Sequence, residues 1–409
     1  MSASPLTARP STFAALKERN YAFYWLGLVC YVLGHRAEYM TFAWLTWELT
    51  RDPRYLGFLG LAQGVPLVAF QLYGGVLADR ADRVRLLLAT QLGTAATLIA
   101  AFVLTVVGVV RVEYLLALAA LSSVFRAFDE PVRLSLVPQL VERARLPNAI
   151  ALGSIPWQAG RMIGPSITGI LIAAFGGAVG LGLAAGASCA ALALYSRLRV
   201  RRDVVAPTAH GMGRQLLEGL SFVGGNFVFA ALICLALFNA LFGLSYVTLL
   251  PVYADAYFRA GSTGFGLLNA AHGAGALVGT LTVASIAHRI LRPGTTLLVT
   301  ALGLGLSLML FSQSPWLPMA FAMLVLVGFC NTFYLTQVST FLQTHVPDHL
   351  RGRVMGIYSL CWNLLPLGGM LGGWLAALVD ARFAVLIGGG LVAINAAALL
   401  TSRRLRAIH

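Results

Sequence analysis

The sequence repeats long apolar segments along almost its whole length. A membrane-spanning helix needs about 20 consecutive, predominantly apolar residues. We identify twelve such segments, at residues 22–48, 56–78, 85–109, 113–137, 149–174, 178–197, 228–256, 263–288, 294–312, 316–343, 353–379 and 383–402. Because backbone N–H and C=O groups find no water in the hydrocarbon region, each segment should form a helix. The sequence therefore predicts an all-α membrane protein with twelve transmembrane helices.

The composition and the placement of charge support this prediction and indicate an orientation. Only 11% of the 409 residues are charged, whereas a soluble domain has about 25%. With twelve spans, both termini lie on one side of the membrane. Of the 29 Lys and Arg residues, 20 fall on that side, 5 on the other and 4 inside spans. The positive-inside rule then places both termini in the cytoplasm of a multi-pass protein, which we expect in a bacterial inner membrane.

The chain divides into two near-equal halves at its longest polar connection. Residues 1–198 and 215–409 each hold six spans, and residues 199–214 form a cytoplasmic linker. An amphipathic stretch at 215–223 follows the linker and should lie at the membrane surface. A weak internal repeat relates the halves. Two six-helix halves with parallel repeats predict a substrate site between them, near the midplane of the membrane.

The loop between the second and third spans carries the most specific motif. The stretch reads Gly74-Gly75-Val76-Leu77-Ala78-Asp79-Arg80-Ala81-Asp82-Arg83-Val84-Arg85. Its pattern Gly-x-Leu-Ala-Asp-Arg-x-x-Arg resembles the signature loop of the major facilitator superfamily of transporters, except that Asp82 stands where the family usually has a glycine. The resemblance implies that Asp79 closes the cytoplasmic side against the positive N-terminus of the eleventh span. The residues of this predicted gate are Gly75, Asp79, Arg80, Arg83, Arg351 and Arg353.

A second motif lies in the fifth span, at Gly160-Arg161-Met162-Ile163-Gly164-Pro165-Ser166-Ile167-Thr168-Gly169. It resembles the antiporter motif Gly-x-x-x-Gly-Pro-x-x-Gly-Gly, which the superfamily associates with exporters, although Thr168 replaces one glycine. Small residues such as Gly160, Gly164 and Gly169 permit close approach of a neighbouring helix. Pro165 removes one helical hydrogen bond and permits a kink. The alternative interpretation is generic packing of small residues.

The fourth span carries four charged residues at spacings of three and four: Arg126, Asp129, Glu130 and Arg133. A charge at the bilayer centre costs about 2.5–3.5 kcal/mol on insertion scales, so such residues need partners or a function. Residues at these spacings share a helical face, and we expect Arg126 to pair with Glu130. Asp129 is expected to pair with Arg133. The position of Arg126 resembles that of an arginine tied to proton coupling in the superfamily; the alternative for both arginines is a structural ladder of ion pairs, which we favour for Arg133.

The first and fifth spans add three further residues to the predicted proton and substrate cavity. His35 and Glu38 lie one turn apart on a shared face and are candidate proton carriers, or else a satisfied polar cluster. Arg36 points about 100° away and should face another helix. Arg161 either pairs with Glu38 or Glu130 or binds an anionic substrate. Lone polar residues in the second half are expected to form interhelical hydrogen bonds: Asn239, His272, Asn331, Gln337 and Asn363.

Further stretches resemble the exporter branch of the superfamily that includes enterobactin and macrolide efflux proteins. They include Phe42-Ala43-Trp44-Leu45, Leu146-Pro147-Asn148-Ala149-Ile150, Leu250-Pro251-Val252-Tyr253 and Gly264-Phe265-Gly266-Leu267-Leu268. The resemblance implies a secondary active transporter that exports a small amphiphilic molecule, such as a drug, siderophore or metabolite, in exchange for protons by alternating access. The alternatives are an importer or uniporter of the same fold and, less favoured, a polytopic membrane enzyme.

The sequence also argues against several classes of protein. It has no Gly-x-x-x-x-Gly-Lys loop for ATP and no Asp-Asp-x-x-Asp motif for a metal-bound pyrophosphate. Its 5 cysteines all fall in apolar spans at no metal-binding or disulfide spacing. We therefore expect no enzymatic activity, no cofactor and no metal. The expected partners of this monomer are a small-molecule substrate, protons and the lipid bilayer, with no nucleic acid despite a net charge of +14.

Reporter fusions test the predicted topology. A reporter fused after Arg202 should report the cytoplasm, and one fused after Asp380 should report the exterior, because the arginine asymmetry orients every span. The reverse result at either position would refute the topology.

Overall fold

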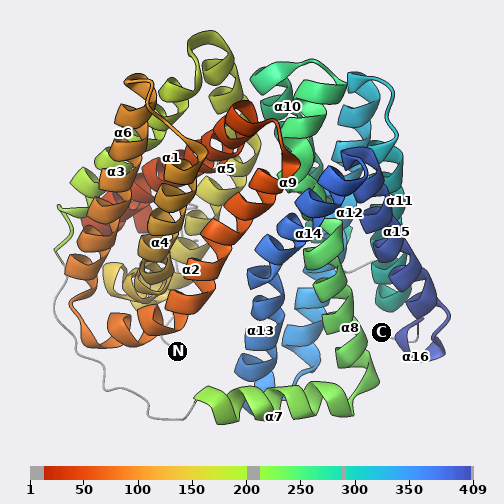
Figure 1. Ribbon diagram of the computed structural model, residues 1–409. Coiled ribbons are helices and arrows are strands. Elements are labelled where there is room, and N and C mark those ends of the chain that lie inside the picture. The colour runs from red at the N-terminus through yellow and green to blue at the C-terminus, as the bar shows by residue number, and fades with distance from the viewer. Residues whose placement is uncertain (1–12, 200–211, 287–291, 407–409) are drawn as a thin grey trace, which may run out of the picture.

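The computed structural model describes residues 13–199, 212–286 and 292–406, and these ranges are helical, with no strand. Each of the twelve predicted spans corresponds to one long helix or to consecutive helices, which Figure 1 shows as two bundles side by side. The N-terminal bundle consists of α1 (Arg19–Thr50), α2 (Pro53–Arg80), α3 (Arg83–Val106), α4 (Val112–Leu140), α5 (Leu146–Phe175) and α6 (Gly177–Tyr195).

Two spans of the C-terminal bundle are interrupted. The seventh consists of α8 (Phe227–Phe238), the π-helix η3 (Asn239–Gly243), α9 (Ser245–Val252) and the π-helix η4 (Tyr253–Tyr257). The eleventh consists of α13 (Asp348–Asn363) and α14 (Leu365–Leu378). The remaining spans are α10 (Gly261–Ile286), α11 (Pro293–Ser312), α12 (Leu317–His345) and α15 (Ala381–Leu400). Because π-bulges are frequent at functional sites, the seventh span is a candidate location for a functional site.

Four short elements lie outside the spans. They are the 3₁₀-helices η1 (Ala14–Lys17) and η2 (Arg143–Arg145) and the helices α7 (Met212–Gly225) and α16 (Arg403–Arg406). The amphipathic stretch predicted at 215–223 lies within α7, which runs across the ends of the long C-terminal helices (Figure 1).

Charge is distributed unequally between the bundles. Eight of the spans are long and apolar enough to cross a membrane by composition alone, and these comprise α3, α6 and all six spans of the C-terminal bundle. The remaining four, α1, α2, α4 and α5, all belong to the N-terminal bundle. Three of these, α1, α4 and α5, carry the charged residues that the sequence places inside spans. The N-terminal bundle therefore holds most of the charged residues of the transmembrane region.

Aspartate side chains cap the N-termini of α2 and α3, the two helices that the signature loop connects. Asp52 caps α2, and its side chain accepts a hydrogen bond from the Arg54 backbone N–H at 2.9 Å. Asp82 caps α3 in the same manner, accepting from the backbone N–H groups of Val84 and Arg85 at 3.1 Å each. The departure from the family pattern at Asp82 is thus the N-cap of α3.

The two bundles meet closely at one end, where glycines face each other. A Cβ atom placed on Gly266 of α10 would lie 2.5 Å from the Pro165 carbonyl oxygen of α5. A Cβ on Gly169 of α5 would lie 2.6 Å from the Ser262 carbonyl oxygen of α10. Both distances are too short for any side chain, so glycine at these positions permits α5 and α10 to touch.

A second contact seals the same end. There α2 packs on α14: a Cβ on Gly373 would lie 2.6 Å from the Pro53 carbonyl oxygen. Arg51, at the end of α1, forms an ion pair with Asp255 of η4, and the Trp47 indole N–H donates to Asp255 at 3.0 Å. Away from this end α2 and α13 diverge toward the side of α7 (Figure 1). The two bundles are therefore in close contact at the end formed by Pro53, Gly373 and Asp255.

Substitution of Gly266 tests this closure. Gly266→Leu should destabilise the closed end by about 1–3 kcal/mol, the typical cost of overpacking, because the Pro165 backbone leaves no room for a side chain. Spin labels on cysteines introduced at Phe175 and Arg259, in a background without native cysteines, should then show a new population at longer distance.

Gly186→Leu is the matched control, because a Cβ at Gly186 of α6 would meet nothing within 4 Å. An unchanged distance distribution in a folded Gly266→Leu protein would show that the glycine contact does not hold this end closed.

Candidate functional site

Residues of the predicted gate lie at the end opposite the glycine contacts. Arg83 donates from Nη1 to the Ser135 carbonyl oxygen of α4 at 3.3 Å. Arg353 of α13 forms an ion pair with Glu218 of α7, and Arg351 lies two residues before it on α13. The side chains of Asp79 and Arg80, and Gly75, lie outside the described residues. The contact predicted between Asp79 and the start of α13 therefore stays a prediction.

The antiporter-like motif packs in two directions. A Cβ on Gly160 would lie 2.5 Å from Val32 of α1, and one on Gly164 would lie 2.8 Å from the Cβ of Arg36. Gly169, farther along α5, faces α10 of the other bundle instead. The motif thus allows α5 to touch α1 within its own bundle and α10 across the interface, and the space at Gly164 accommodates Arg36.

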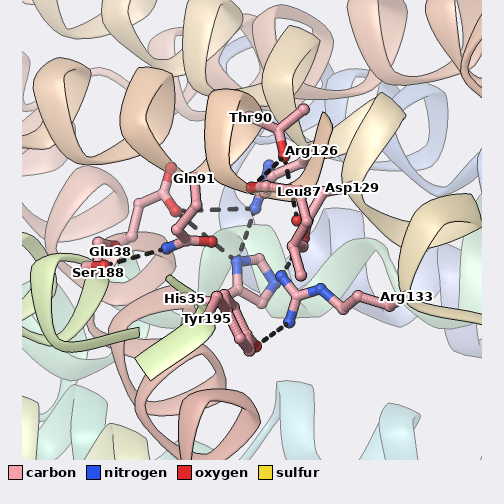
Figure 2. Close-up of polar contacts among 10 residues, drawn as sticks. All are labelled: His35, Glu38, Leu87, Thr90, Gln91, Arg126, Asp129, Arg133, Ser188 and Tyr195. Atoms are coloured by element: carbon pink, nitrogen blue, oxygen red, sulfur yellow. Dashed lines mark hydrogen bonds and ion pairs between the residues drawn. The ribbon is translucent and has the colours of Figure 1, made fainter. Parts of the chain in front are cut away.

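One buried cluster joins α1 to α4. Glu38 is 1% exposed and accepts a hydrogen bond of 2.5 Å from the Ser122 hydroxyl. Arg126 lies 3.9 Å from the Glu38 carboxylate, and its Nη1 is 2.7 Å from Nδ1 of His35. A second contact, at 2.8 Å, joins Arg126 to the Ser123 hydroxyl. Figure 2 shows His35 and Arg126 directed toward each other beside Glu38.

This arrangement corrects one expectation and supports another. The predicted pair Arg126–Glu130 is wrong, because Arg126 turns toward Glu38 of the neighbouring helix. The shared face of His35 and Glu38 is confirmed, with 3.8 Å between His35 Nδ1 and the Glu38 carboxylate. Glu130 is exposed and has no hydrogen bond or ion pair among the described residues. Spacing on one helix could not reveal that the better acid for Arg126 lies on another.

A second buried cluster contains the predicted pair Asp129–Arg133, which is confirmed. Both residues are at most 5% exposed. The Arg133 guanidinium lies 3.1 Å from the centre of the Tyr31 ring and donates to the Tyr195 hydroxyl at 3.2 Å. Asp129 also accepts from the Thr90 hydroxyl at 3.4 Å. Four helices thus surround one ion pair, which agrees with the structural role favoured for Arg133 (Figure 2).

Two cavities open between the bundles beside these clusters. The first, of 430 Å³, is lined by α1, α2, α4 and α5 on one side and by α9 and α14 on the other; Glu130 lies on its wall, and we call it the Glu130 cavity. The second, of 550 Å³, is lined by α1 and α5 on one side and by α9, α10, α12, α13 and α14 on the other; we call it the Arg161 cavity. His35, Tyr39 and Leu365 line both.

The Arg161 cavity contains two arginines. Arg36 and Arg161 both lie on its wall. The Cβ of Arg36 lies against Gly164 of α5, so the prediction that Arg36 faces another helix is confirmed. Neither has a hydrogen bond or ion pair among the described residues, and the buried Arg36 Nε has no partner. The predicted pairing of Arg161 with Glu38 or Glu130 is therefore not formed.

The C-terminal bundle contributes neutral polar groups. Asn239 of η3 donates to the Asn331 side chain of α12 at 2.9 Å, which confirms one predicted interhelical hydrogen bond. The Tyr246 hydroxyl of α9 lies 2.8 Å from Nδ1 of His272 of α10. Tyr246, His272 and Asn331 line the Arg161 cavity. Tyr246 was not expected from sequence, because a tyrosine in an apolar span is also an ordinary packing residue.

Twelve spans in two six-helix bundles around shared central cavities define a transporter of the major facilitator type. The sequence profile of the transmembrane secretion effector family matches residues 10–409. The chain belongs to this family, and the membership expected from the loop motif is confirmed.

The chain is also similar in sequence or fold to characterised transporters. The chain is 29% identical over 355 residues to the multidrug efflux pump Tap of Mycolicibacterium fortuitum, covering 84% of this chain and 86% of that protein. It is 28% identical over 421 residues to the enterobactin exporter EntS of Escherichia coli, covering 98% and 94%. A solved bacterial homologue of the human lysosomal transporter Spinster has the same fold, with a TM-score of 0.74 at 16% identity over 95% of this chain and 98% of the other.

The Asp129–Arg133 pair yields a stability prediction. Asp129→Ala should cost about 3–5 kcal/mol of unfolding free energy, since it leaves the buried Arg133 without its carboxylate. Glu142→Ala, which removes an exposed partner of Arg145, should cost about 0–1 kcal/mol. Thermal unfolding in detergent measures both variants, and equal midpoints for the two would contradict the importance of the buried pair.

Proposed function

We propose that this protein exports a small amphiphilic molecule in exchange for protons, by alternating access between its two bundles. The observation that carries the proposal is the pair of adjoining cavities, walled by both bundles and lined with titratable residues. A site between the bundles gains access to the other side when one bundle rocks on the other. The export direction is supported by the similarity to two exporters.

The closed end supports an orientation for this state. Arginines cluster at the opposite end, for example Arg83 and Arg85 at the start of α3 and Arg351 and Arg353 on α13. By the positive-inside rule that end faces the cytoplasm, and the cavities are then accessible to cytoplasmic substrate. Closing this end requires α13 to approach α2, and we propose that Asp79 stabilises the closed form through the N-terminus of α13.

Proton coupling rests on the acids beside the cavities. Glu130 is an exposed carboxylate on a cavity wall with no partner among the described residues, so it can gain or lose a proton without breaking an ion pair. Glu38 lies one layer deeper, and His35 connects it to both cavities. Protonation of His35 would strengthen its contact with Glu38 and oppose its contact with Arg126. The cluster can therefore respond to protons while both of its helices stay in one bundle.

Energised inverted vesicles test the coupling. Glu130→Gln should abolish uphill, uncoupler-sensitive export of compounds that the wild-type protein exports from a panel. Downhill movement should persist, because the amide keeps the size of the side chain but takes no proton. Glu38→Gln should also uncouple export, with substrate binding less affected.

Glu113→Gln is the matched control, because Glu113 is an exposed acid at the start of the same helix α4. If both Glu38→Gln and Glu130→Gln retain uphill export at the level of this control, the two acids are structural and the proton site is elsewhere.

A further inference from the structure

The charged residues in the central parts of α1, α4 and α5 do not balance. They are four arginines and three acids: Arg36, Arg126, Arg133, Arg161, Glu38, Asp129 and Glu130. Glu38 forms an ion pair with Arg126, and Asp129 forms one with Arg133. Arg36 and Arg161 are left with no acid, and Glu130 is left with no base. Since an unpaired charge in a membrane is expensive, the two remaining arginines require an explanation other than packing.

No described residue on the wall around these arginines carries a negative charge. The residues that line the Arg161 cavity include both arginines, two histidines and several amides and hydroxyls, but no Asp or Glu. Glu130 lines the neighbouring Glu130 cavity and not this one. An anion that enters from solution would neutralise Arg36 and Arg161.

The same cavity is apolar over much of its remaining wall. Trp362 of α13 supplies aromatic surface, and Val247 of α9 and Leu335 of α12 supply aliphatic surface. A cavity of 550 Å³ is within the range that holds a drug-sized molecule. The arginines come from the N-terminal bundle and these apolar residues from the C-terminal bundle, so one ligand would contact both.

We propose that the Arg161 cavity binds an amphipathic organic anion, whose carboxylate or comparable acidic group is held by the Arg36 and Arg161 guanidinium groups. Its apolar body packs against Trp362 and Leu335. Guanidinium groups match planar oxyanions through paired N–H donors, and both arginines have these donors uncommitted among the described residues. This inference rests on the proposed function for its biological meaning, but the binding it describes requires neither a proton gradient nor a direction of transport.

Space for this arrangement is created by the antiporter-like motif. Gly164 leaves room for the Cβ and Cγ atoms of Arg36, which would lie 2.8 and 3.3 Å from a Cβ at that position. Arg161 lies one turn away on the same helix, three residues before Gly164. The glycine therefore lets α1 present its arginine beside that of α5.

Equilibrium dialysis against the full-length protein in phosphatidylcholine nanodiscs tests the proposal. The probe is naphthalene-2-carboxylate, and its uncharged and cationic counterparts are naphthalene-2-carboxamide and 2-naphthylmethylamine. The wild-type protein should bind the carboxylate at least about 10-fold more tightly than the amide, and the amine more weakly than either, as expected when a charged hydrogen bond is gained.

Substitutions separate the charge from the shape of the site. Arg36→Gln and Arg161→Gln should each weaken carboxylate binding about 10- to 100-fold and change amide binding less than about 2-fold. Arg36→Lys and Arg161→Lys keep the charge and should retain part of the preference for carboxylate. Arg404→Gln, an exposed arginine of α16, is the control and should bind like the wild-type protein.

Two results would overturn the proposal: equal binding of carboxylate and amide by the wild-type protein, or an unchanged preference for carboxylate in the Arg36→Gln/Arg161→Gln double variant. If the Gln variants fail to fold, a reduced but retained preference for carboxylate in both folded Lys variants still supports the proposal, and an undiminished preference in both, or no preference in the wild-type protein, refutes it. Carboxylate binding without export in vesicles would leave this site intact and refute the proposed export.

Discussion

The pairing of charges within the N-terminal bundle determines what the rest of the molecule can do. Arg126 forms an ion pair with Glu38, and Arg133 forms one with Asp129, so both buried acids have partners inside the bundle. Breaking such a buried pair is far more costly than forming it is stabilising, so the pairs fix α1 and α4 in one arrangement. The charges that remain unpaired all face cavities between the bundles. A rigid bundle with uncommitted charges on its inner wall suits a site that binds ligand and proton while it moves as a unit.

The two bundles contribute different kinds of residues to the cavities. The C-terminal bundle is apolar enough to be recognised as membrane-spanning in all six spans, and its contributions to the cavities are amides, hydroxyls, histidine and aromatic rings. Its contact with the other bundle includes close approaches at glycines, as at Gly266 against Pro165, beside side-chain contacts such as that of Trp44 with Phe265. Contacts between small residues hold helices close without a deep interlock, and this allows the interface to separate.

Much of the fold could be predicted from the sequence, because lipid imposes both the length and the helical form of each span. All twelve segments were found, and the ends of α7 and of the spans differ from the expected ranges by a few residues. The interruptions of the seventh and eleventh spans were not predicted, since the apolar pattern continues through Asn239–Gly243 and through Leu364.

The site was harder to predict, because its contacts join helices that are far apart in the sequence. Pairing within one helix was correct for Asp129 and Arg133, whose side chains meet along α4. The same rule failed for Arg126, because Glu38 lies 88 residues away and is closer in space. Ser122 is a polar residue one turn before Arg126, and this spacing could have indicated a buried polar network. Nothing in the sequence around Tyr195 indicated its contact with Arg133. The positions of Arg36 and Arg161 beside one another follow only from how α1 packs on α5.

We propose that substrate and protons use the same set of cavities and move in opposite directions. The most direct test is proton flux in proteoliposomes that hold a pH-sensitive dye, with the membrane potential clamped and no initial pH gradient. An imposed gradient of an exported compound should drive protons against the direction of compound movement in the wild-type protein. Movement of the compound with no accompanying proton flux, or with protons in the same direction, would contradict the account.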